Sequence, residues 1–156
     1  MIQRIQTVFL FLVVVCMGVT IGTGLWEQAV EGQVWQLNAF VLENLDADGE
    51  VISATSKWYL AALAAFAGLL ALISIFQYKD RGRQMMLNMV NSLLMVGLVA
   101  TTFLTTNGLN SELGIEVSGT YKIGFWAILV AMVCNMVANR FIRKDEALVR
   151  SVDRIR

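Results

Sequence analysis

The chain has 156 residues, of which 57% are hydrophobic and 15% are charged, and it contains no histidine and no proline. A soluble domain carries roughly 25% charged residues, so this composition excludes an ordinary soluble protein and indicates a membrane protein. Twelve basic and twelve acidic residues cancel, so no net charge points to nucleic acid as a partner. Two cysteines are too few for a disulfide framework, and histidine, the commonest general base and metal ligand, is missing.

Four apolar stretches contain no Asp, Glu, Lys or Arg, and they cover residues 8–25, 58–78, 85–105 and 123–139. A helix that crosses a bilayer needs about 20 residues, within a range of about 17–25. Unbroken helices satisfy their own backbone hydrogen bonds in lipid, and no proline interrupts these stretches. The sequence therefore predicts an all-α membrane protein, with residues 1–156 forming a single four-helix transmembrane bundle.

The charged residues between these spans are sorted by sign. Ten of the twelve basic residues lie at the chain ends and in the loop 79–84, whereas the segments 26–57 and 106–122 hold eight acids and only Lys57 and Lys122. By the positive-inside rule, both termini face the cytoplasm and the two acidic segments lie outside. A cleaved signal peptide is the alternative for residues 8–25, but the run is long for one and no A-x-A site follows it.

The first outer segment, residues 26–57, has the pattern of β-structure. Apolar and polar residues alternate over 35–41, residues 46–49 (Asp-Ala-Asp-Gly) supply turn chemistry, and residues 50–53 can return as a second strand. Residues 112–118 of the second outer segment alternate in the same way. Three strands with a shared apolar face can hold together where an isolated hairpin cannot, so we expect a small extracytoplasmic sheet drawn from both segments.

The cytoplasmic tail, residues 140–156, is expected to continue the fourth helix. Its apolar residues fall on one helical stripe, at Phe141, Leu148, Val152 and Ile155. The stripe can pack on the protein's own helices, or it can lie on anionic headgroups or against a partner. In the second case, the contact with the partner or the anionic lipid is made by cations at the two chain ends, namely Arg4, Arg143, Lys144, Arg150 and Arg154.

Polar side chains inside the spans gather near the cytoplasmic boundary. Spacings of three and four residues place Asn88 and Asn91 on one face of the third span, and Asn135 and Asn139 on one face of the fourth. This intramembrane layer can provide hydrogen bonds between helices, each contributing about 0.6 kcal/mol. The alternative is a polar vestibule, open to the cytoplasm, that grips a headgroup.

Small residues and thiols in the spans allow two further expectations. Gly18 and Gly22 form a GxxxG motif, which predicts close backbone approach along the first span, either to the second span or to another copy of the chain. Cys16 and Cys134 fall at similar depth and could form a redox pair, but buried cysteines usually behave as small hydrophobic side chains. We expect no catalytic residues, no metal site and no cofactor.

The two ends of the chain carry a family resemblance. Three segments resemble a family of four-helix membrane proteins of Bacteroidetes. They are Met-Ile-Gln-Arg-Ile-Gln-Thr at residues 1–7, Arg-Lys-Asp-Glu at 143–146 and Leu-Val-Arg-Ser at 148–151. That family is known only as a domain of unknown function. The resemblance implies a bacterial inner membrane, but it supplies no reaction, ligand or partner.

The leading functional hypothesis is a non-enzymatic inner-membrane protein that acts as an accessory or scaffold subunit of a membrane complex. The alternative is a protein that binds or transports a lipid or small hydrophobic molecule by means of the asparagine layer. The expected partners of the chain are membrane lipid and either another protein subunit or a second copy of the chain. Nucleic acid is not expected as a partner.

Overall fold

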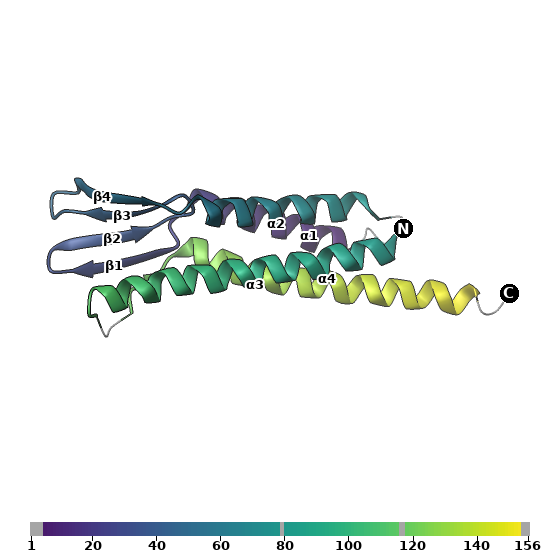
Figure 1. The fold of residues 1–156 in the computed structure, drawn as a ribbon. Helices are drawn as coiled ribbons and strands as arrows, with labels where there is room; N and C mark the ends of the chain where they lie inside the picture. Colours follow the sequence, from purple (N-terminus) through teal and green to yellow (C-terminus); the bar gives the residue numbers. More distant parts are fainter. Residues whose placement is uncertain (1–4, 79, 116–117, 154–156) are drawn as a thin grey trace.

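The computed structural model describes residues 5–78, 80–115 and 118–153, with side chains described up to residue 147. Four long helices lie side by side, and a β-sheet projects from one end of them (Figure 1). The helices are α1 (Ile5–Gly22), α2 (Trp58–Phe76), α3 (Arg81–Glu112) and α4 (Ile123–Asp153). We call the end that carries the sheet the sheet end, and the opposite end, where α1 begins and α4 finishes, the terminal end.

The four helices are long and apolar enough to cross a membrane. α1 packs against α2 and α4, and α3 packs against the same two neighbours. Many of their large apolar side chains face outward: Phe66, Leu104 and Met136 are 61%, 68% and 66% exposed. Soluble proteins seldom expose contiguous apolar surface of this kind, whereas lipid-facing helices present it everywhere.

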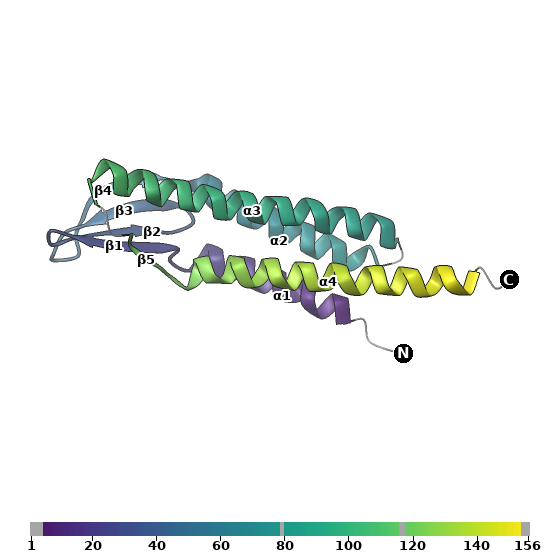
Figure 2. The ribbon, with the colours of Figure 1, turned by 90° about the horizontal axis from the view of Figure 1, so that it is seen from below.

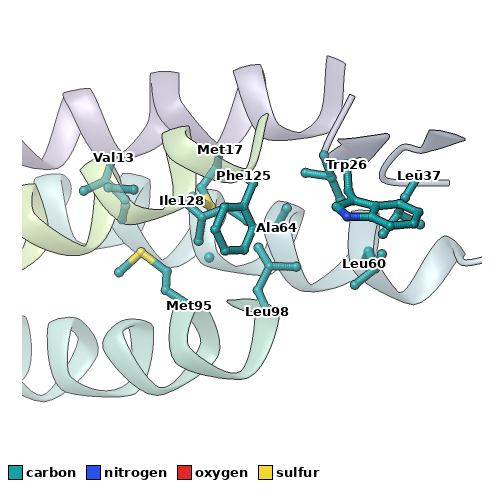
Figure 3. Close-up of a cluster of buried hydrophobic side chains, with 14 of the residues drawn as sticks. Val13, Met17, Trp26, Leu37, Leu60, Ala64, Met95, Leu98, Phe125 and Ile128 are labelled. Carbon is teal, nitrogen blue, oxygen red and sulfur yellow. The ribbon is translucent and has the colours of Figure 1, made fainter. Parts of the chain in front are cut away.

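A continuous core joins the helices to the sheet (Figure 3). Met17, Met95 and Ile128, from three different helices, are at most 1% exposed. At the sheet end the same core continues through Leu37 and Trp26, which are also fully buried. The core thus fixes the sheet against the helix ends instead of leaving it as a free loop.

The sheet has five antiparallel strands in the order β4-β3-β2-β1-β5. Its strands are β1 (Trp26–Val30), β2 (Gln33–Leu37), β3 (Val41–Leu45), β4 (Val51–Ser56) and β5 (Thr120–Tyr121). Figure 2 shows β5 beside β1, leading into α4. The prediction of an all-α protein is therefore wrong: the chain has an α+β fold, because the first outer segment alone forms four strands.

Local turn chemistry explains why there are more strands than the sequence predicted. Residues Glu31 and Gly32 both have positive φ, of 49° and 83°, and they close a two-residue turn between β1 and β2. The expected strand over 35–41 is broken at Asn38, whose side-chain oxygen accepts hydrogen bonds from the backbone N–H of Phe40 and Val41. The expected turn over 46–49 is confirmed, with Gly49 at φ 81°.

The predicted strand over residues 112–118 is wrong. α3 continues to Glu112 and the Leu113 N–H still bonds back to the Leu109 carbonyl, so the first of these residues belong to the helix end. Residues 116–117 lie outside the described part of the chain. The strand of the second outer segment is instead β5, at residues 120–121.

The helix boundaries also differ from the predicted spans. With 32 residues, α3 is about 48 Å long, well beyond the roughly 30 Å hydrocarbon core of a bilayer. α4 runs without a break to Asp153, which confirms that the tail continues the fourth helix through the described residues. Within the chain, Gly18 and Gly22 do not form a close contact, since a Cβ added at either would meet nothing within 4 Å. The close approach occurs instead at Gly124, where an added Cβ would lie 2.8 Å from the Gly24 carbonyl oxygen.

Candidate functional site

The four asparagines of the expected polar layer lie between the helices near the terminal end. Asn88, Asn91 and Asn135 are 0% exposed, and Asn139 is half-buried. Helical spacing puts the two α3 residues on the same face of that helix. The structure thus brings the predicted residues of α3 and α4 into one buried layer.

Hydrogen bonds connect this layer across three helices. The Asn135 Nδ2 donates to the Asn88 backbone carbonyl and to the Ser92 hydroxyl, each at 2.8 Å. The Ser74 hydroxyl of α2 donates to the Asn88 Oδ1, also at 2.8 Å. The layer therefore fixes the positions of α2, α3 and α4 relative to one another.

Gln84 and Ser74 are members of the layer that the sequence analysis missed. The Gln84 Nε2 donates to the Ser74 backbone carbonyl at 2.9 Å, and both residues are 0% exposed. Gln84 lay within the predicted loop 79–84, but it stands four residues before Asn88. That helical spacing is the signal that could have identified it.

Several amide atoms of the layer have no hydrogen-bond partner among the described residues. They include both amide atoms of Asn91 and the side-chain oxygens of Gln84 and Asn135. For Gln84 and Asn135 the identity of the free atom is fixed, because each nitrogen faces a backbone carbonyl that can only accept. A buried acceptor without a partner lowers the stability of the folded state. The layer therefore contains more hydrogen-bonding groups than the contacts between the helices use.

Of the five predicted contact cations, two have described side chains. Arg143 and Lys144 are exposed on α4, and the nearby Arg81 of α3 donates to the Asp145 backbone carbonyl. Arg4 and Arg154 lie outside the described residues, and the side chain of Arg150 is not among those described. The described cations are thus available at the surface of the terminal end.

A cavity of about 360 Å³, which the sequence analysis did not find, opens where the sheet joins the helices. It is lined by the end of α1, the starts of β1 and β3, the end of β2 and Lys122. Within it, the Lys122 Nζ lies 3.1 Å from the Glu27 Oε2, and Gln36 also contacts that carboxylate at 3.4 Å. No local pattern reveals this pair, because the two residues come from different outer segments.

The two thiols of the spans are not joined by a disulfide. Cys16 and Cys134 are both free, one half-buried and one buried. Among the described residues, no group of three His, Cys, Asp or Glu side chains could hold a metal ion.

One family of sequences matches almost the whole chain. The family model described as "Domain of unknown function (DUF4293)" matches residues 2–155. The chain belongs to the DUF4293 family. The DUF4293 match covers every described helix and strand, so the sheet and the helices fall within one family unit. The predicted membership of a domain-of-unknown-function family is confirmed, and no curated protein matches the chain.

Proposed function

We propose that the protein is a non-enzymatic integral protein of a bacterial inner membrane, with both termini in the cytoplasm and the sheet outside. In this proposal it is an accessory or scaffold subunit that holds an extended segment of a partner protein on β4. The four apolar helices and the bias of basic residues toward the terminal end support the orientation. The open edge of the sheet at β4 is the observation that carries the function.

β4 is an edge strand whose pairing with β3 is irregular at Ile52, but it has neither of the other common protections against pairing, charge and proline. It is the last strand in the sheet order, and all six of its side chains are exposed. Its sequence, Val-Ile-Ser-Ala-Thr-Ser, contains no charged residue and no proline. Natural edge strands are commonly shielded by charges, proline or bulges. The irregularity at Ile52 leaves residues 53–56 as the regular, uncharged part of the edge, and this part is suited to receive a further strand.

The register identifies the backbone groups that face outward. Lys57 donates its N–H to the Phe40 carbonyl, and the residue pairs of β3 and β4 follow in antiparallel register from there. Because hydrogen-bonded pairs alternate along an antiparallel ladder, Thr55 and Ser53 bond toward β3. The N–H and C=O groups of Ala54 therefore point toward the open edge.

The expected occupant is a strand of another protein and not β4 of a second copy. The hairpins extend along the same axis as the helices (Figure 1), so two copies inserted in one membrane would present their β4 strands parallel to each other. A two-fold axis along the strands places identical residues at the same height. In a parallel ladder, only one of two facing residues directs its N–H and C=O groups toward the other strand. Identical residues related by the two-fold axis would both direct these groups toward the partner strand or both direct them away, so two β4 strands cannot pair in this arrangement.

The tail supplies the second contact of the proposed complex. Arg143 and Lys144 are exposed residues in the C-terminal part of α4, and that end of α4 lies far from β4 (Figure 1). On the cytoplasmic side they can bind acidic groups of the same partner or anionic lipid. Binding at both ends of the helices would hold a partner across the membrane.

The test compares two substitutions at one position. Ala54→Pro removes the outward N–H without removing a bond to β3, whereas Ala54→Ser keeps it. Each full-length variant is expressed in the native host with a photo-crosslinker at Ile52, and the protein captured by wild type is identified by mass spectrometry. We expect Ala54→Pro to abolish the specific crosslink and Ala54→Ser to retain it, with thermal stability of both close to wild type. Equal crosslinking by both variants would remove β4 as the docking strand.

A further inference from the structure

The cavity where the sheet joins the helices lies at a defined depth in the membrane if the helices cross it. The inference drawn below about this cavity rests on that part of the proposed function. Its wall includes Ile21 and Gly22, the last residues of α1, and Lys122, the residue directly before α4. Trp58 and Trp126, near the starts of α2 and α4, are 65% and 58% exposed. Exposed tryptophans at helix ends mark the interface between lipid and water, so the cavity opens at headgroup level.

The lining combines an apolar base with a few polar groups. Leu37 is fully buried beneath the cavity, and Phe40, 53% exposed, stands beside it. The polar groups are the carboxylate of Glu27, the ammonium of Lys122 and the side chain of Gln36. A site with an apolar wall and a small number of placed polar groups is the usual form of a small-molecule pocket.

The ion pair in the cavity can be replaced by contacts between each of its charges and a bound ligand. The side chains of Lys122 and Glu27 are 41% and 36% exposed, and pairs with this much exposure contribute little to stability. A ligand that carries one positive and one negative group can replace both halves of the pair without leaving either charge uncompensated. A purely anionic ligand would place its charge against the carboxylate.

The residues that carry the two charges follow one another along the axis of the molecule. Lys122 donates its backbone N–H to the Leu25 carbonyl, whereas Glu27 pairs with Thr120 farther along β1. The backbone of the cation is therefore nearer the helices, and that of the carboxylate is nearer the outer tip of the sheet. In a phospholipid with an ethanolamine headgroup, the phosphate is nearer the acyl chains and the ammonium is farther out, which matches this order.

We propose that this cavity binds the headgroup of a zwitterionic phospholipid of the outer leaflet, with Lys122 on the phosphate and Glu27 on the primary ammonium. The hydrogen bonds from the ammonium to the carboxylate are charge-assisted, and a quaternary choline group cannot make them. The site thus prefers phosphatidylethanolamine to both phosphatidylglycerol and phosphatidylcholine. It is distinct from the asparagine layer near the terminal end, where the sequence placed its alternative lipid site.

The test uses full-length protein reconstituted in nanodiscs with equal amounts of the three phospholipids. Lipids retained after release into mild detergent are measured by native mass spectrometry. The informative variant is the double exchange Glu27→Lys with Lys122→Glu, which keeps an ion pair but reverses its order. The matched control is Glu50→Lys with Lys57→Glu, which exchanges two outer charges that do not line the cavity.

Wild type and control are expected to retain phosphatidylethanolamine over phosphatidylglycerol, and the reversed pair should lower that ratio about tenfold, as expected for one lost charge-assisted contact. Glu27→Gln should shift retention toward phosphatidylglycerol, because only the cation remains. An unchanged ratio in the reversed variant, or equal retention of all three lipids by wild type, would overturn the headgroup site. A wild-type protein washed from native membranes by carbonate would instead contradict the membrane proposal itself.

Discussion

Asn135 on α4 donates its side-chain amide to the backbone carbonyl of Asn88 on α3, with 2.8 Å between Nδ2 and the oxygen. Both residues are fully buried, and the same nitrogen also reaches the Ser92 hydroxyl. In the proposed membrane location, the hydrophobic effect does not select one rotation of an apolar helix over another, so directed hydrogen bonds and packing shape do so. This contact therefore sets the rotation of α4 against α3.

Replacing Asn135 by alanine should destabilise the protein by about 0.6–1.7 kcal/mol, from the average to the largest value found for hydrogen bonds between membrane helices. The measurement is the thermal unfolding midpoint in detergent. Met136→Ala is the control, because this neighbouring side chain is 66% exposed and faces away from the other helices. Equal loss of stability in the two variants would contradict a specific role for the Asn135 amide.

Gly119 lies where no side chain fits. An added Cβ would lie 2.4 Å from the Gln28 Oε1 and 2.7 Å from the Trp26 Cε2. Gly119→Ala should therefore push β5 away from β1 and cost about 1–3 kcal/mol, the usual effect of overpacking. Gly108→Ala, at a helical position with open space around it, should leave stability unchanged or raise it slightly. Thermal unfolding of the two variants side by side checks both expectations.

The proposed orientation predicts opposite accessibility for Asp48 and Arg143. After Cys16 and Cys134 are replaced by alanine, a membrane-impermeant maleimide added to intact cells should label Asp48→Cys. The same reagent should label Arg143→Cys only after the membrane is opened. Both positions are exposed, so accessibility reports the side of the membrane and not burial. Labelling of Arg143→Cys in intact cells would reverse the orientation.

Composition was sufficient to predict the four helices, because charge-free apolar stretches of this length have few alternatives in lipid. β1 was missed because Gln28, a buried polar residue, interrupts the apolar alternation that identifies a strand. The Glu27–Lys122 pair was missed for a different reason. It depends on the register between β1 and the chain before α4, and that register arises only when the two outer segments meet. The asparagine layer, by contrast, follows from helical spacing within each span.

Asn38 offers a test of how the cavity wall is built. Its side-chain oxygen accepts the backbone N–H groups of Phe40 and Val41, at 2.9 and 2.8 Å, and so turns the chain from β2 into β3. Asn38→Ala removes this acceptor and should lower stability by about 1 kcal/mol, since both N–H groups lose their partner. Asn38→Asp keeps an oxygen at the same position, so its thermal midpoint in detergent should stay near that of wild type. If the aspartate variant is as unstable as the alanine variant, the amide nitrogen of Asn38, and not the acceptor oxygen, supports the turn.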